Sequence, residues 1–175
     1  FMGSHSYPIK KNWLFKFISN FKEKTILAPT ASHQSLTTSS FNNFYFKSIK
    51  QSLYYGISNF RFFPLFPNPH LRSNSFMINS DDFLELNLIK CKHKIDTWKN
   101  ESGRNSMTNQ LIKKNFNTLV VNDDGRSFKM SEWKYSETYA FGNQLKLLIS
   151  DKHTRVYQNS NEQTKKIIEK NNWEE

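Results

Sequence analysis

The chain is poor in the residues that build disulfide frameworks, zinc sites and phosphate-binding loops. It has one cysteine, Cys91, among 175 residues, which excludes an internal disulfide and a zinc site built from cysteines. Glycine and proline occur five times each, and no glycine-rich phosphate loop is present. No run of about 18 apolar residues occurs, so a membrane-spanning helix is not expected. Charge and aromatic content remain as the informative features.

Acidic residues are almost absent from the first 80 residues. This part contains nine Lys or Arg and a single acid, Glu23, together with twelve of the sixteen Phe. The other 95 residues carry sixteen basic and fourteen acidic residues, so the net charge of +10 divides as +8 and +2. A basic excess at one end of a chain predicts an anionic partner.

The asymmetry predicts an α+β protein in two parts. Residues 1–80 are expected to form a long basic, aromatic N-terminal extension, and residues 81–175 a small, strand-rich α+β domain with a C-terminal helix. Hydrophobic residues make up 37% of the chain, and the mean hydropathy is -0.72. Because little material is available for an independent core, we expect a large host to hold the extension in place.

The extension contains one or two predicted helices. Trp13, Phe17 and Phe21 lie four residues apart, which predicts a helix near 12–22 with Asn12 as its cap. A second helix is predicted near 43–60, because five apolar residues follow helical spacing there: Phe46, Ile49, Leu53, Ile57 and Phe60.

The other segments of the extension are expected to be non-helical. Residues 30–40 are rich in Ser and Thr without periodicity, which predicts an irregular linker. Three prolines, at positions 64, 67 and 69, exclude a helix in the following segment. Residues 61–80 are therefore expected to be extended.

Residues 81–175 contain short patterns typical of strands and others typical of helices. Leu84, Leu86 and Leu88 alternate with polar residues, which predicts a strand, and 144–149 is another strand candidate. Asp124-Gly125 suits a tight turn and predicts a hairpin near 118–130. A short helix is expected over 107–114, and a capping-box pattern predicts a terminal helix near 161–173.

No catalytic or metal-binding arrangement is evident in the sequence. It contains no recognisable pairing of a nucleophile with a base, and no carboxylate pair in an apolar setting. Asp123 and Asp124 stand beside Gly125, where a turn role is favoured over metal binding. Four histidines lie in unrelated local contexts without metal-ligand spacing: His33, His70, His93 and His153. We therefore predict a protein that is not an enzyme and uses no cofactor or metal.

Nucleic-acid binding has a physical basis in this composition. Lys and Arg neutralise phosphates, and flat aromatic side chains stack on unpaired bases. The predicted nucleic-acid-binding residues are Lys10, Lys11, Lys16, Lys47, Lys50, Arg61, Arg72, Arg126, Lys129, Lys134, Lys152 and Arg155. The alternative for each cluster is a solvated charged face over an ordinary aromatic core.

Two stretches carry a resemblance to a known family. The stretch from Leu119 to Phe128, and a later one from Asp151 to Asn159, are similar to the mitochondrial form of large-subunit ribosomal protein thirty-one. The likeness covers about 40 of the 175 residues. The chain departs from the family in that Tyr157 replaces the usual Trp and Gln158 separates it from Asn159. The resemblance implies that Arg126, Lys129 and Lys134 lie on ribosomal RNA.

These observations predict a non-catalytic structural constituent of the mitochondrial ribosome. Its partners would be ribosomal RNA and neighbouring ribosomal proteins in the mitochondrial matrix, with no small-molecule substrate. The alternative is a peripheral accessory subunit of a mitochondrial respiratory-chain complex, whose Phe-rich segments pack on membrane-embedded partners while basic residues face anionic lipid. A third possibility is an import sequence that precedes an independent domain of residues 81–175.

Overall fold

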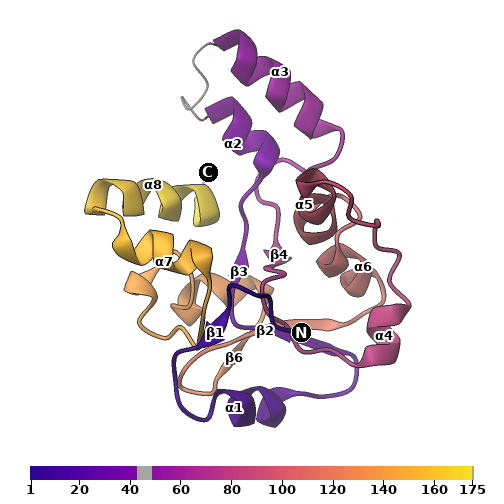
Figure 1. The fold of residues 1–175 in the computed structure, drawn as a ribbon, viewed down its shortest axis with the longest axis vertical. Coiled ribbons are helices and arrows are strands. Elements are labelled where there is room, and N and C mark those ends of the chain that lie inside the picture. Colours follow the sequence, from indigo (N-terminus) through magenta and orange to yellow (C-terminus); the bar gives the residue numbers. More distant parts are fainter. Residues whose placement is uncertain (43–48, 175) are drawn as a thin grey trace.

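A computed structural model of the chain describes residues 1–42 and 49–174 (Figure 1). Its α-helices are α1 (Trp13–Asn20), α2 (Leu36–Asn42), α3 (Ile49–Phe60), α4 (Ser80–Leu84), α5 (Lys94–Ser102), α6 (Met107–Lys113), α7 (Lys152–Asn159) and α8 (Glu162–Trp173). Two 3-10 helices follow the hairpin, η1 (Met130–Ser136) and η2 (Gly142–Gln144). Its strands are β1 (Tyr7–Pro8), β2 (Thr25–Ala28), β3 (Ala31–Ser32), β4 (His70–Leu71), β5 (Asn117–Val121), β6 (Ser127–Phe128) and β7 (Ile149–Ser150). The predicted α+β class is confirmed.

A three-stranded mixed sheet joins the two ends of the sequence. Its order is β2-β5-β6, with β2 parallel to β5 and β6 antiparallel to β5. In the parallel pair, Ile26 faces Thr118 and Ala28 faces Val120. Two smaller antiparallel pairs, β1-β7 and β3-β4, extend from this centre. The first 32 residues therefore supply strands to all three sheets.

The side chains of β2 and β5 point alternately to two apolar clusters. Ile26 and Val120 belong to one cluster, which includes Leu111 and Trp133. Leu27 and Val121 belong to the other, which Phe17 of α1 covers. This alternation is the two-residue period of a strand buried on both faces. The sheet is thus the centre of the core, with packing on each side.

The predicted division at residue 80 differs from this arrangement. Residues 1–80 were expected to extend away from an independent domain, but Ile26 and Leu71 are fully buried in the same core as Leu111 and Val120. Non-local pairing of β2 with β5 is the physical reason, since periodicity within one segment carries no information about its partner strand.

The helices expected in the first part are present, with changes at their ends. The predicted helix 12–22 is α1, although Asn12 adopts a left-handed conformation with φ 56° and makes no side-chain cap bond. The helix predicted over 43–60 is described as α3 from Ile49 onward, and 43–48 lie outside the described residues. The linker predicted over 30–40 is partly helical instead, because α2 begins at Leu36. The segment 61–80 is mostly non-helical, as predicted, but it has turns at 61–62 and 73–74, and α4 starts at Ser80.

In the second part, the hairpin and the predicted helices 107–114 and 161–173 are confirmed as β5-β6, α6 and α8. Gly125 adopts a φ of 74° in the turn. The strand over Leu84 to Leu88 was wrong, since α4 includes Leu84, and the backbone N–H groups of Leu86 and Leu88 donate within turns to the carbonyl oxygens of Phe83 and Leu86. The domain is accordingly richer in helix than in strand.

The strand candidate 144–149 was also mostly wrong. Gln144 has a positive φ of 56° within η2, and only Ile149 and Ser150 form a strand. A positive φ is incompatible with the extended backbone of a strand. Within the described residues, no helix is long and apolar enough to cross a membrane.

Candidate functional site

A polar pocket of about 450 Å³ lies where β3, β4, α5 and α7 meet. Its walls carry ionisable and polar side chains from segments far apart in the sequence: His70, Arg72, Asn74, Glu101, Tyr139 and His153. A pocket of this size, with convergent polar groups, is the usual form of a small-molecule site. It is the candidate functional site of the protein.

Arg72 is the central charge of the pocket. It follows β4 directly, and its backbone N–H donates to the carbonyl oxygen of Thr30 at 3.1 Å, which fixes the chain beside β3. Its side chain is only 9% exposed, with Nη2 3.6 Å from Oδ2 of Asp151. The guanidinium carbon lies 4.0 Å from the ring centre of Tyr139. Its buried Nε has no hydrogen-bond partner in the described part of the chain.

Two carboxylates hold the segment from Arg72 to Asn74 from opposite sides. Asp151 caps α7, because its Oδ1 accepts the Thr154 backbone N–H at 2.8 Å, and its Oδ2 accepts a bond from the Asn74 side chain. Glu101 of α5 accepts bonds from the Ser73 backbone N–H at 3.2 Å and from the Ser73 hydroxyl. The position of the guanidinium is therefore set by both helices.

Two histidines border the same pocket. Nδ1 of His70 lies 2.8 Å from the carbonyl oxygen of Asn68, and because a carbonyl only accepts, Nδ1 carries the proton. Burial lowers the pKa of His70, despite the opposing effect of Glu101. Burial also lowers the pKa of His153, and Arg72 lowers it further. Both imidazoles are thus neutral at pH 7 and able to accept a proton.

An aromatic side chain stands at the edge of the pocket. Trp98 of α5 lines it and is 40% exposed. Nζ of Lys94 lies 5.0 Å from the centre of the Trp98 ring. The indole thus offers a flat apolar surface beside the charged groups, which suits a ligand with both an anionic and a less polar part.

The predicted nucleic-acid-binding residues do not form one strip. Lys10, Lys11 and Lys16 lie at or near α1, whereas Lys50 and Arg61 lie on or next to α3, and these helices are at opposite ends of the molecule (Figure 1). Lys47 lies outside the described residues.

Several of these cations have internal partners. Lys10 and Lys16 lie 3.1 Å and 2.7 Å from the carboxylate of Asp123. Lys134 lies 3.3 Å from Glu174, and Arg155 donates to the carbonyl oxygen of His5 at 3.3 Å. The exposed members of the set are Lys11, Lys50, Arg61, Arg126, Lys129 and Lys152. Arg72, by contrast, is buried and belongs to the pocket.

Sequence reasoning missed the grouping in the pocket. It treated the histidines as unrelated, but the fold places His70 and His153 on the same pocket wall as Glu101. The one signal in the sequence was Arg72 itself, the single basic residue between Arg61 and Lys90. Arg72 was predicted to bind nucleic acid, whereas in the structure it lines a pocket.

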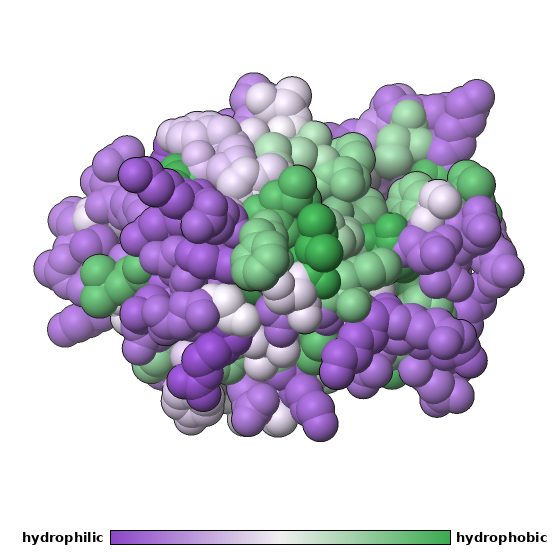
Figure 2. All heavy atoms as spheres, turned by 90° about the horizontal axis from the view of Figure 1, so that it is seen from below, coloured by the Kyte–Doolittle hydropathy of each residue, from purple (hydrophilic) through white to green (hydrophobic). Residues whose placement is uncertain are grey.

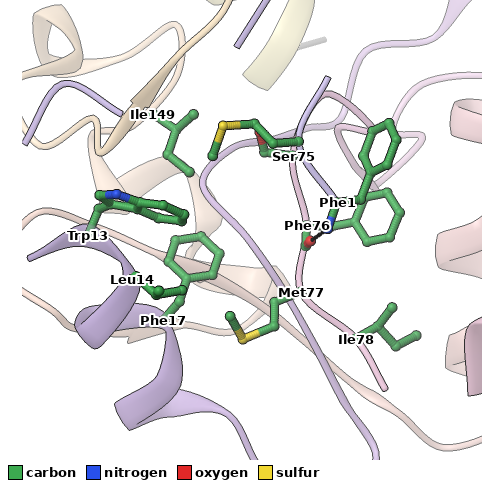
Figure 3. Close-up of a pocket in the computed structure, with 10 residues that line it drawn as sticks. Phe1, Trp13, Leu14, Phe17, Ser75, Phe76, Met77, Ile78 and Ile149 are labelled. Carbon is green, nitrogen blue, oxygen red and sulfur yellow. Dashed lines mark hydrogen bonds between the residues drawn. The ribbon is translucent and has the colours of Figure 1, made fainter. Parts of the chain in front are cut away.

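A second, smaller hollow of about 280 Å³ lies beside α1 and is lined mainly by apolar side chains (Figure 3). Trp13, Leu14 and Phe17 of α1 face Phe76 and Ile149 across it. The space-filling view from below shows hydrophobic residues gathered at the centre of this end of the molecule (Figure 2). The hollow has few polar groups, so it is a poorer candidate for chemistry than the Arg72 pocket.

Comparison with protein-family models, with curated proteins and with solved structures finds no match. The resemblance to a ribosomal protein family therefore stays a prediction. In the part of the chain that the structure describes, no group of three or more His, Cys, Asp or Glu side chains is placed to hold a metal ion. The pocket and the exposed cations are the features of the molecule that bear on its function.

Proposed function

We propose that this protein binds an anionic small molecule in the pocket around Arg72. The observation that carries the proposal is the guanidinium of Arg72, which is buried at the pocket wall with its Nε unpartnered. Arg has a planar set of donors that matches the two oxygens of a carboxylate or phosphate. A ligand of this class in the pocket would pair with the positive charge of the guanidinium.

A purely structural role explains Arg72 less well. Buried charges are normally paired and fully hydrogen-bonded, because desolvation of an unsatisfied donor costs about 1–3 kcal/mol. Asp151 pairs with Arg72 at 3.6 Å, beyond hydrogen-bond distance. The carboxylate is instead bonded to Thr154 and Asn74. The charge of the guanidinium is thus only partly compensated within the protein, which favours an anionic ligand in the pocket.

The size and lining of the pocket favour an organic anion over a bare inorganic ion. About 450 Å³ lies within the range of ligand sites, roughly 300–1,000 Å³. Trp98 would cover the apolar part of such a ligand, and Glu101 and His70 would meet its hydroxyl or amino groups. The neutral histidines also supply proton acceptors, should the bound molecule undergo acid-base chemistry.

The test is calorimetric titration of the full chain with phosphate monoesters, nucleotides and dicarboxylates, and with inorganic phosphate for comparison. Arg72→Gln is expected to weaken binding about 10- to 100-fold, since a charged hydrogen bond contributes about 1.5–3 kcal/mol. Arg72→Lys keeps the charge without the planar guanidinium, so it distinguishes loss of paired hydrogen bonds to the ligand from loss of folding. Lys113→Gln is the matched control, since Lys113 is exposed and does not line the pocket. Equal affinity of the Arg72→Gln variant would exclude the proposal.

Binding of ribosomal RNA, as a constituent of the mitochondrial ribosome, is the second candidate. A specific observation favours it: cations gather around the turn of the β5-β6 hairpin. Lys10 and Lys16 share Asp123, and Lys146 lies 2.8 Å from Asp124. Arg126 is exposed beside them. Four cations against two carboxylates leave this edge positive, which supports contact with phosphates.

Titration with single-stranded RNA at two salt concentrations tests this candidate. Replacing Arg126 and Lys129 by Gln is expected to weaken binding and to reduce its salt dependence, because fewer counterions are released. Sedimentation of the endogenous protein with ribosomal particles, lost on ribonuclease treatment, would support the ribosomal role. Unchanged RNA affinity in the double variant would count against it, without affecting the Arg72 pocket.

A further inference from the structure

Helix α3 packs on α2 through its small and polar residues. The Ser52 hydroxyl donates to the carbonyl oxygen of Ser40, and the Asn59 side chain donates to the Ser40 hydroxyl at 2.9 Å. Gly56 lies between them and is so close to the Phe41 ring that an added Cβ would be 2.3 Å from it. Positions 52, 56 and 59 follow helical spacing, so one face of α3 is a contact face without large apolar side chains.

The large apolar residues of α3 point to solvent instead. Leu53, Ile57 and Phe60 are all exposed, with Ile57 67% accessible, and Tyr54 beside them is exposed as well. Leu53, Ile57 and Phe60 belong to the apolar stripe from which this helix was predicted. The usual arrangement of an amphipathic helix, apolar face inward, is therefore reversed. The α2-α3 pair stands at one end of the molecule (Figure 1), where these apolar side chains remain exposed.

The α2-α3 pair itself carries charge of one sign. No Asp or Glu occurs between Glu23 and Asp81 in the sequence. Lys50 near the start of α3 and Arg61 after its end are exposed. Arg104 lies against the same end, with its Nη2 donating to the Phe60 carbonyl oxygen at 2.9 Å and its guanidinium carbon 5.1 Å from the Phe60 ring. An exposed apolar face is thus bordered by cations at the ends of the helix.

We infer that α3 docks this protein on an anionic membrane surface. Leu53, Ile57 and Phe60 would enter the boundary between headgroups and acyl chains, with the helix parallel to the membrane plane, while Lys50 and Arg61 pair with anionic headgroups. This combination of an apolar face with basic residues is the chemistry of interfacial helices. The inference is independent of the Arg72 pocket, to which α2 contributes only its first residue, Leu36.

Co-sedimentation of the full chain with phosphatidylcholine vesicles, with and without phosphatidylserine, tests the inference. Binding is expected only with phosphatidylserine, and it should weaken with added salt. Ile57→Asn is expected to weaken it about 10- to 100-fold, because a polar side chain no longer gains from transfer out of water into the apolar part of the bilayer. The matched control is Leu145→Asn, since Leu145 is also 67% exposed but lies outside the α2-α3 pair.

Three outcomes would overturn the inference. One is absence of binding to phosphatidylserine vesicles, and another is equal binding of the Ile57→Asn and Leu145→Asn variants. The third is concentration-dependent self-association without lipid binding, abolished by Ile57→Asn in analytical ultracentrifugation, which would assign the α3 face to a second copy of the chain. A circular dichroism spectrum like that of the unaltered chain verifies that the variant has folded.

Discussion

Asp151 has three roles in one carboxylate. It caps α7, binds the side chain of Asn74 and faces the guanidinium of Arg72 at 3.6 Å. Its side chain is 3% exposed. A buried carboxylate with this many donors links the stability of the fold to the shape of the pocket, because the same groups position Arg72.

Replacing Asp151 by Ala is expected to destabilise the protein by about 3–5 kcal/mol, since a buried cation loses its partner and α7 loses its cap. The control is Asp123→Ala, which removes partly exposed ion pairs with Lys10 and Lys16 and is expected to cost about 1 kcal/mol or less. Denaturant unfolding measures both. Similar losses in the two variants would contradict a special role for Asp151.

The histidines predict how stability depends on pH. Burial lowers the pKa values of His33, His70 and His153 from the ordinary 6.5. Below pH 6.5 the unfolded chain therefore binds protons that the folded chain does not, so stability falls as the pH decreases. Above pH 6.5 these histidines do not make the free energy of unfolding depend on pH. Thermal unfolding between pH 8 and pH 5 measures the effect.

Replacing His70 distinguishes the contribution of the histidines to the pH dependence of stability from that of the carboxylates. His70→Asn is expected to flatten the slope between pH 6.5 and pH 5, because one buried imidazole no longer titrates. Burial would raise the pKa of Asp123, but Lys16 and Lys10 outweigh it and lower the pKa from 3.8. The Asp123 carboxylate therefore affects stability only at a more acidic pH than the histidines do. An unchanged slope in His70→Asn would show that His70 is not responsible.

At the scale of elements, the α2-α3 pair is held by close approach of the helices at Gly56. An added Cβ there would lie 2.3 Å from the Phe41 ring. Gly inside a helix is otherwise unfavourable by about 1 kcal/mol relative to Ala. Close packing and helix propensity thus act in opposite directions at this position, and which one dominates depends on Phe41.

The sign of the Gly56→Ala effect should therefore depend on the residue at position 41. In the unaltered chain the substitution is expected to destabilise, because the methyl group meets the Phe41 ring. In a Phe41→Ala background it is expected to stabilise by about 0.5–1 kcal/mol. A double-mutant cycle from chemical denaturation measures the coupling. Additive effects would mean that the ring moves aside without cost.

Elements with a local cause were the predictable ones. The hairpin follows from Asp124-Gly125, whose backbone provides the turn between β5 and β6. The stripe of α3 was also predicted, but its orientation was not, because spacing identifies an apolar face without identifying what covers it. The strand predicted from Leu84 to Leu88 was wrong because these residues make local helix and turn hydrogen bonds, which the two-residue alternation does not reveal.

At the scale of the whole molecule, the pocket depends on contacts that no local pattern contains. Arg72 comes from β4, Glu101 from α5 and His153 from α7, so its groups span about eighty residues of sequence. Only the tertiary fold brings them together, which is why sequence reasoning found the basic residue and missed its surroundings. The same non-local pairing defines the core, through β2 and β5.

Residues 81–175 alone are therefore expected not to fold. Without the first 80 residues, β5 loses its parallel partner β2, and Leu111 and Val120 lose their contacts with Ile26 and Leu71. Each such loss in a core costs about 2–5 kcal/mol, and a whole domain is stable by only about 5–15 kcal/mol. Nuclear magnetic resonance spectra of the fragment should lack the dispersion of the full chain. A dispersed spectrum with cooperative unfolding would instead show that residues 81–175 fold independently. Residues 1–80 would then again be a basic extension, the part of the chain that was expected to bind ribosomal RNA.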